Sequence, residues 1–310
     1  MKRKSLVAFA VLLSLCLTMV GCAGPFSAGT SKENATSVPA ESERPSEASA
    51  SEEPKPTEQE AAKNGSADED NSNPITDVIN LKTTTFNLDG ISFTMVLVEG
   101  GTFTMGSNSR ESNQAPEHEV TLSSYLIGET EVTQALWNAV MGSGGSSDEY
   151  PIASVTKPQC DTFVEKLNEM AHAAGIIPDD MNFHVPTEAQ WEFASKGGNL
   201  SKGYTYSGSD VLSEVGWTSD DGSSVHKVKQ KSPNELGLYD MSGNVYEWVA
   251  DYAADYSSEA QTDPCNLTPS NNYIKRGGSF YYNDSYRFTS TYRYFYSSTD
   301  YTIGVRICLY

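Results

Sequence analysis

Basic residues are scarce in this chain of 310 residues. It contains 21 Lys and Arg against 41 Asp and Glu, which gives a formal net charge of −20. Nucleic-acid affinity depends on clustered Lys and Arg that neutralise phosphates, so the composition argues against a nucleic-acid partner. Residues 86–310 alone carry −16 of this charge. Such an acidic domain suits divalent cations or cationic partners.

Histidine and cysteine are also rare, and neither occurs at the spacing of a metal site. There are four His and five Cys, with no HExxH motif, no His pair four residues apart and no CxxC, which argues against a zinc site. Three cysteines remain beyond the N-terminal segment: Cys160, Cys265 and Cys308. An odd number leaves at least one unpaired, and the sequence does not choose a disulfide among them.

Long apolar runs are absent except at residues 6–20. This run follows the basic residues 2–4 and ends at Gly21-Cys22, so residues 1–22 read as a signal peptide. Residues 19–22 resemble a bacterial lipobox, which implies that Cys22 is lipidated and becomes the mature N-terminus. The alternative is an ordinary signal peptide with an incidental cysteine. Lipidation predicts a protein of the cell envelope, outside the cytoplasm and anchored to a membrane.

Aromatic and branched apolar residues are nearly missing from the segment that follows. Residues 23–85 are rich in Ser, Glu and Pro and carry a net charge of −7. A segment of low hydrophobicity and net negative charge buries too little surface to offset the entropy of ordering. We therefore expect a disordered acidic stalk over 23–85 and a folded domain over 86–310.

The pattern within 86–310 is that of a single α+β domain. Residues 91–98 alternate as a strand, and a second strand ends at Gly106. Thr156 with Gln159, and Thr187 with Gln190, have the spacing of capping boxes at helix starts. Thr133 opens a further short helix. No internal repeat of 20–50 residues is present, which argues against solenoids and propellers.

Several motifs of this domain resemble the formylglycine-generating enzyme family, also called sulfatase-modifying factor domains. They occupy residues 101–106, 129–134, 185–194, 233–248, 276–279 and 304–306. Their order is that of the family, and together they span nearly all of residues 93–307. The resemblance implies an irregular fold related to the C-type lectin fold.

A structural calcium site is predicted at residues 240–247. Ca²⁺ takes six to eight oxygen ligands, and a tight turn supplies both carboxylates and backbone carbonyls. The resemblance implies ligation by the side chains of Asp240 and Glu247 and by the main-chain oxygens of Gly243 and Val245. The alternative is a turn and strand whose acids face solvent.

The thiols that the family's enzymes use are missing. Those enzymes oxidise a substrate cysteine with two copper-binding cysteines shortly after the Gly-Gly-Ser motif, and the matching positions here are Tyr282 and Arg287. Thr302 stands where an active-site Asn is usual, and only Ser279 is retained. Because neither a phenol nor a guanidinium replaces a copper thiolate, we expect no copper and no formylglycine formation.

Residues 280–302 have an unusual composition. They hold seven of the 17 tyrosines and three of the 11 phenylalanines, and they contain no Ala, Gly, Val, Leu, Ile, Glu or Lys. Tyr mixed with Ser, Asn and Asp is typical of antibody binding surfaces. The segment also resembles the variable region of proteins diversified by retroelements. The predicted ligand contacts are Phe280, Tyr281, Tyr282, Asp284, Tyr286, Tyr292, Tyr294, Tyr296 and Tyr301.

Three classes of function are consistent with these features. The first, which the tyrosine-rich segment favours, is a lipid-anchored binding protein for an unidentified protein or glycan. The second is an enzyme of the same fold with altered chemistry, and the third is a structural lipoprotein of the envelope. Sequence alone does not identify the ligand or the oligomeric state.

Overall fold

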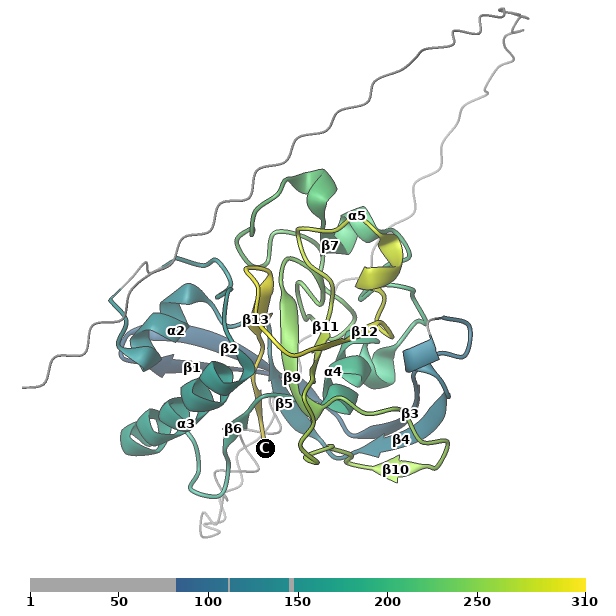
Figure 1. Cartoon of the computed structure of the whole chain (residues 1–310). Coiled ribbons are helices and arrows are strands. Elements are labelled where there is room, and N and C mark those ends of the chain that lie inside the picture. The colour runs from purple at the N-terminus through teal and green to yellow at the C-terminus, as the bar shows by residue number, and fades with distance from the viewer. Residues whose placement is uncertain (1–81, 111, 145–147) are drawn as a thin grey trace, which may run out of the picture. The chain divides into compact units, whose positions relative to one another are not determined.

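The computed structural model describes residues 82–310, apart from 111 and 145–147 (Figure 1). The longer strands are β1 (Thr83–Leu88), β2 (Ile91–Val98), β3 (Gly101–Met105), β4 (His118–Leu122), β5 (Tyr125–Gly128), β9 (Tyr246–Tyr252), β11 (Tyr273–Arg276), β12 (Arg293–Tyr296) and β13 (Ile303–Val305). Two-residue strands are β6 (Phe183–His184), β7 (Gly216–Trp217), β8 (Ser242–Gly243), β10 (Gln261–Thr262) and β14 (Cys308–Leu309). The α-helices are α2 (Gln134–Met141), α3 (Lys157–Ala174), α4 (Glu188–Ser195) and α5 (Leu212–Val215).

The strands of the described residues form four sheets. The largest has the order β1-β2-β5-β14-β6, and a four-stranded sheet has the order β12-β11-β9-β13. The others are β10-β4-β3 and the pair β7-β8. Short mixed sheets with few helices confirm the predicted α+β class, which forms one domain over the described residues.

The helix starts follow the predicted capping pattern. Thr156 and Thr187 each accept a hydrogen bond from the backbone N–H three residues on, and Gln159 and Gln190 complete both capping boxes. Thr133 caps α2 in the same way, without the reciprocal glutamine. These caps satisfy backbone donors that have no partner inside the helix.

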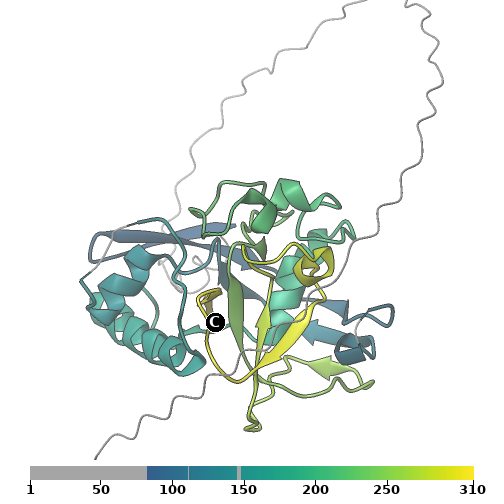
Figure 2. The same ribbon diagram turned by 45° about the horizontal axis from the view of Figure 1, so that its top comes forward.

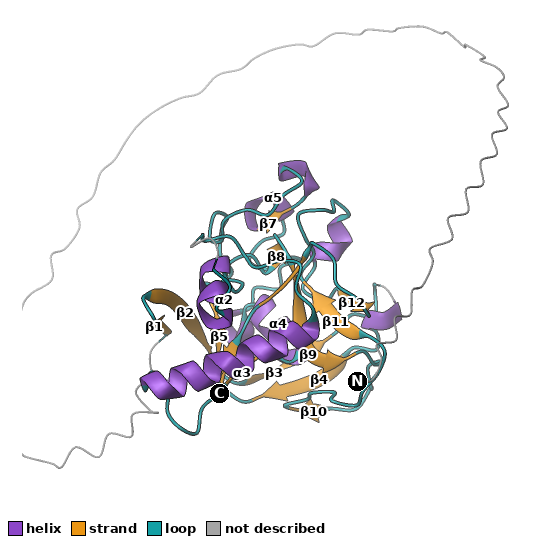
Figure 3. Cartoon of the chain, turned by 60° about the vertical axis from the view of Figure 1, so that its left-hand side comes forward, coloured by secondary structure: helices purple, strands orange, loops and turns teal. Residues whose placement is uncertain are grey.

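Two hydrophobic cores lie on opposite faces of the five-stranded sheet. Successive side chains of a strand point to opposite faces, so Met95 joins the core under α2 and α3 while Val96 joins the core around α4. Leu126 and Ile127 of β5 divide in the same way. Figure 3 shows α3 crossing in front of the sheet region, and α4 is buried along all eight residues.

The folded region begins earlier than the predicted boundary at residue 86. β1 starts at Thr83 and pairs antiparallel with β2 along its whole length, so residues 83–85 belong to the domain and not to the stalk. The three threonines at the start of β1 are polar, but they are β-branched and suit an edge strand. The pairing with β2 anchors Phe86 and Leu88 in the core, which local composition alone did not indicate.

The predicted signal peptide 1–22, the predicted lipidation site Cys22 and the predicted stalk up to residue 81 lie outside the described residues. Within residues 82–310, gaps excepted, no helix is long and apolar enough to cross a bilayer. The predictions for the N-terminal segment therefore rest on its sequence.

Candidate functional site

Three arginines and three glutamates form ion pairs deep inside the domain, with all six side chains nearly inaccessible to solvent. The main pairs are Glu188–Arg293, Glu192–Arg276 and Glu247–Arg306, and Arg276 also lies 3.5 Å from Glu188. Each joins segments at least 59 residues apart. A buried charge that loses its partner is strongly destabilising. These six residues, five of them from the family-like motifs, therefore hold the framework together.

Two of these pairs fasten the tyrosine-rich segment to α4. Arg293 donates from Nε and Nη2 to the Glu188 carboxylate at 2.8 and 2.6 Å. Arg276 contacts Glu192 at 2.5 Å and also donates to the carbonyls of Ser290 and Thr291. These buried contacts therefore hold residues 290–293, in the middle of the tyrosine-rich segment, against the core.

The carboxyl of Glu192 is held in its charged form. Burial by itself would raise its pKa, but Lys196 and Arg276 together lower the pKa to about 2. Lys196 approaches one oxygen at 2.7 Å, and the Gly106 N–H donates to the same oxygen.

Replacing Glu192 with Gln should make the stability difference from wild type depend on pH. A carboxyl whose folded pKa lies below its ordinary 4.5 stabilises the fold above that pH and loses this contribution as pH falls toward 2. We expect the difference in unfolding free energy to shrink by about 3 kcal/mol between pH 6 and pH 2. Urea unfolding of both proteins across this range measures it, and a difference independent of pH would contradict the prediction.

Arg306, the arginine of the third pair, joins three separate parts of the chain. Its guanidinium bonds both oxygens of Glu247 and donates to the carbonyls of Gly128 and Tyr239 at 2.8 Å each. The Trp191 Nε1–H donates to Glu247 at 2.7 Å. The Glu247 carboxylate therefore already has partners on both oxygens.

The four predicted calcium ligands are all buried, but they differ in availability. Asp240 is 3% exposed, and its Oδ1 has no hydrogen-bond partner among the described residues. Both carboxylate oxygens of Glu131 are likewise buried and unpartnered. Burial, and next the Asp240 charge, raise the pKa of Glu131. Asp240 and the neighbouring Glu131, which the sequence reasoning missed, have carboxylate oxygens without partners, whereas Glu247 is engaged by Arg306. Among the described residues, no group of three or more His, Cys, Asp or Glu side chains is arranged to hold a metal ion. Gly243 and Val245 are buried within the same segment.

The two positions of the family's catalytic cysteines lie against each other. The Arg287 guanidinium carbon is 4.5 Å from the centre of the Tyr282 ring, and Arg287 also donates to Tyr292 and Asp284 at 3.0 Å. The retained Ser279 is fully buried, and its hydroxyl has no partner among the described residues. Thr302 donates its hydroxyl to Asp300.

None of the three described cysteines occupies either of these positions. Cys160, Cys265 and Cys308 are all free thiols. Cys308 lies in β14 between β5 and β6, and burial raises its pKa well above the ordinary value. A buried thiol of this kind is unreactive because the thiolate is the nucleophile and the metal ligand.

The predicted ligand residues divide into exposed and buried groups. Tyr281, Tyr286, Tyr294 and Tyr301 are 50, 37, 41 and 54% exposed. The Asp284 side chain is also exposed, and Tyr282 and Tyr296 are half-buried. Two assignments need correction: Phe280 and Tyr292 are only 3 and 4% exposed and lie beneath the surface. We call the exposed set Tyr281, Asp284, Tyr286, Tyr294 and Tyr301 the tyrosine surface.

Ring contacts connect the tyrosine surface to the half-buried tyrosines. Tyr281 meets Tyr282 and Tyr301 edge-on, with ring centres 5.2 and 5.6 Å apart. The buried Tyr292 lies between Tyr286 and Tyr294, at 5.6 and 6.5 Å. Mutually supported rings lose little side-chain freedom when a ligand binds.

A buried lysine supports the other end of this surface. Lys275 Nζ lies 4.2 Å from the ring centres of both Tyr246 and Tyr296 and 5.4 Å from that of Tyr294. Asp300 approaches the same nitrogen at 3.3 Å. Cation–π contacts with a desolvated ammonium are among the stronger ones, so they hold the orientation of these rings.

A second segment lies beside the tyrosine surface and was not predicted as part of it. The Ser219 N–H donates to the Tyr282 carbonyl, and Asn283 approaches Asp220 at 3.4 Å. Figure 2 shows the yellow helical turn of residues 285–288 near the green segment that contains α5. Composition gave no signal for residues 219–220, because only the fold brings them to this position.

Comparisons with known proteins agree with this architecture. Residues 90–309 match the model of the sulfatase-modifying factor enzyme 1-like domain. The chain is 33% identical to chaperone protein LppX of Paenibacillus barcinonensis, over 51% of this chain and 71% of that protein. Identity to the formylglycine-generating enzyme of Streptomyces coelicolor is 28%, over 62% of this chain and 80% of that protein. Among solved structures, Treponema denticola variable protein 1 matches with a TM-score of 0.66 and 29% identity, covering 74% of this chain and 99% of that one.

Proposed function

The chain belongs to the sulfatase-modifying factor enzyme 1-like family, and we propose that it serves as a binding protein whose ligand contacts the tyrosine surface. The observation that carries this proposal is the display of four exposed tyrosines over a rigid buried framework. Tyrosine offers a large contact area at low entropic cost, which is why binding surfaces are rich in it.

The similarity to a protein described as variable supports a further part of the proposal. Treponema denticola variable protein 1 shares the fold across nearly its whole length. We propose that residues 280–302 form a diversified segment in this chain as well. The exposed positions can change without disturbing the core, whereas Arg293 and Phe288 cannot, because both are buried.

The ligand class follows from the surface chemistry. Edge-on tyrosine rings with an adjacent Asp284 suit a protein loop or a glycan, both of which combine apolar faces with hydrogen-bonding groups. The net charge of −20 disfavours nucleic acid. With Cys22 as a lipid anchor, the domain would be displayed outside the cytoplasm on the cell envelope.

A formylglycine assay tests whether the chain keeps the chemistry of the family's enzymes. A sulfatase peptide with the Cys-x-Pro-x-Arg motif, incubated with the protein, copper and oxygen, should keep its cysteine, because Tyr282 and Arg287 supply no thiolate. Mass spectrometry of the peptide gives the result, with an active formylglycine-generating enzyme as the positive control. Conversion of the cysteine to formylglycine would refute the assignment.

We further propose that Ca²⁺ stabilises the segment around Asp240, with Glu131 as a carboxylate available in place of Glu247. Removal of calcium with EGTA should lower the Tm by about 5–10 °C, since a ligand at 100 times its Kd contributes about 2.7 kcal/mol to a domain of this size. Differential scanning calorimetry with and without added calcium measures this. Asp240→Asn should weaken the response, and a Tm unaffected by metal stripping would end the calcium proposal.

A further inference from the structure

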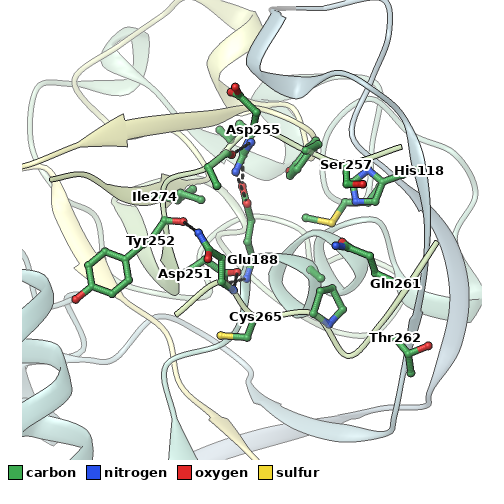
Figure 4. Close-up of a pocket in the computed structure, with 17 residues that line it drawn as sticks. His118, Glu188, Asp251, Tyr252, Asp255, Ser257, Gln261, Thr262, Cys265 and Ile274 are labelled. Atoms are coloured by element: carbon green, nitrogen blue, oxygen red, sulfur yellow. Dashed lines mark hydrogen bonds and ion pairs between the residues drawn. The ribbon is translucent and has the colours of Figure 1, made fainter. Parts of the chain in front are cut away.

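A pocket separate from the tyrosine surface lies beside the N-terminus of α4. Its volume is about 580 Å³, within the range of small-molecule sites. Figure 4 shows Glu188, Asp251, Gln261, Ser257 and His118 arranged around this space, whereas the Tyr252 ring points away from it. The wall combines α4, the end of β9 with its following loop, and residues 261–266.

The charges that line the pocket do not balance. Glu188, Asp251 and Asp255 contribute three carboxylates, and Arg293 is the one Arg or Lys among the lining residues. All three nitrogens of the Arg293 guanidinium already donate within the protein: Nε and Nη2 bond Glu188, and Nη1 donates to the carbonyls of Asn113 and Ala254. Arg293 therefore neutralises Glu188, and at most the second N–H of Nη2 is left for a ligand.

Asp251 remains a buried carboxylate without a cationic partner. It is 7% exposed, and no ion pair among the described residues involves it. Its oxygens accept the backbone N–H groups of Asn266 and Glu188 at 2.8 and 2.7 Å. A carboxylate has about four acceptor positions, so two remain. Burial, and next the charge of Glu188, raise the pKa of Asp251 to about 6, and the two backbone hydrogen bonds and the charge of Arg293 offset this only in part.

The rest of the lining favours a small polar molecule. Gln261 and Ser257 are exposed at the rim, and Met105, Ala189 and Ile274 supply a limited apolar area. Tyr256, which also lines the space, has a buried hydroxyl without a hydrogen-bond partner among the described residues. An alkyl or ring portion with one cationic group matches this combination.

We propose that this pocket binds a small organic ammonium compound, with the primary amine directed at Asp251 and the uncharged part lying toward Gln261 and Ser257. An ammonium group brings three donors and one positive charge, which satisfies the free acceptor positions of Asp251 and the charge excess of the pocket together. The site uses no residue of the tyrosine surface.

The test is calorimetric titration of the full chain with three compounds that each carry one primary amine: glucosamine, ethanolamine and n-butylamine. Each is compared with its acetylated counterpart, in which the amine has lost its charge. We expect at least one amine to bind at least tenfold more tightly than its acetylated form. Failure of all three amines to bind, or equal binding of the acetylated forms, overturns the proposal.

Variants locate the binding. Ser257→Trp should block the mouth of the pocket and weaken amine binding at least tenfold, because Ser257 is exposed and lines the space. Ser258→Trp, one residue farther and outside the lining, is the matched control and should bind as wild type does. Asp251→Asn should also weaken binding, after circular dichroism shows that it is folded. Tyr286→Ser should leave it unchanged. Unaltered amine binding by Ser257→Trp would show that the amine binds elsewhere and would contradict the proposed site. This outcome is independent of whether the tyrosine surface binds a ligand.

Discussion

Replacing Arg306 with Met is expected to lower the unfolding free energy by about 3–5 kcal/mol, the usual cost of breaking a buried ion pair. The variant leaves the Glu247 carboxylate buried without its bidentate partner and removes the donors to Gly128 and Tyr239. Glu131 and Asp240, which this guanidinium also attracts, lose its charge too. For a domain of this size the Tm should fall by about 6–20 °C.

The matched control is an ion pair with an exposed partner. Lys229→Met breaks the contact of Glu129 with a lysine side chain that is 43% exposed, and it should cost less than about 1 kcal/mol. Adding Glu247→Leu to Arg306→Met should recover part of the loss, because two apolar residues leave no unpaired charge. Denaturant unfolding of the wild type and the three variants measures these differences in unfolding free energy. Equal stability of Arg306→Met and wild type would show that the pair is not a structural centre.

Simultaneous replacement of Tyr281, Tyr286, Tyr294 and Tyr301 by Ser is expected to weaken ligand binding at least 100-fold while leaving the Tm within a few degrees of wild type. Aromatic hot spots contribute about 2 kcal/mol or more each when truncated, and 1.4 kcal/mol is a tenfold change in Kd. The side chains are 37–54% exposed, so their loss removes little from the core.

The measurement needs a ligand, which a glycan array and a displayed protein library screened with the wild-type domain would supply. Biolayer interferometry on the best hit then gives the Kd of each variant. The control carries Tyr310→Ser and Leu267→Ser, two exposed positions outside residues 280–302, and should bind like wild type. A four-serine variant that keeps its Kd within a factor of two would disprove the role of this surface.

Sequence variation among natural isolates tests the proposed diversification of residues 280–302 independently. If residues 280–302 are diversified, related isolates should differ at exposed positions such as 281, 286 and 294 and agree at buried Phe288 and Arg293. A template repeat and a reverse transcriptase gene should lie nearby in the DNA. Isolates that are identical throughout the segment would contradict the diversification proposal. The binding proposal would then be tested by the serine variants alone.

Much of the architecture could be predicted because its signals are local. Capping boxes depend on residues three positions apart, and strand alternation has a period of two. Thr156 with Gln159 and the strand at 91–98 were therefore readable from the sequence. β1 was not, because three threonines become a strand only when β2 is beside them.

The sequence by itself determined the family, the α+β class, the absence of the enzyme's two thiols and the concentration of tyrosine in residues 280–302. Only the tertiary structure decided which of those residues face solvent, since Phe280 and Tyr292 have the same composition signal as Tyr281 and Tyr294 but pack inward. It also decided that Glu247 pairs with Arg306, 59 residues away. The physical reason is that burial and charge pairing depend on neighbours brought together by folding, whereas caps and periodicity depend on adjacent residues.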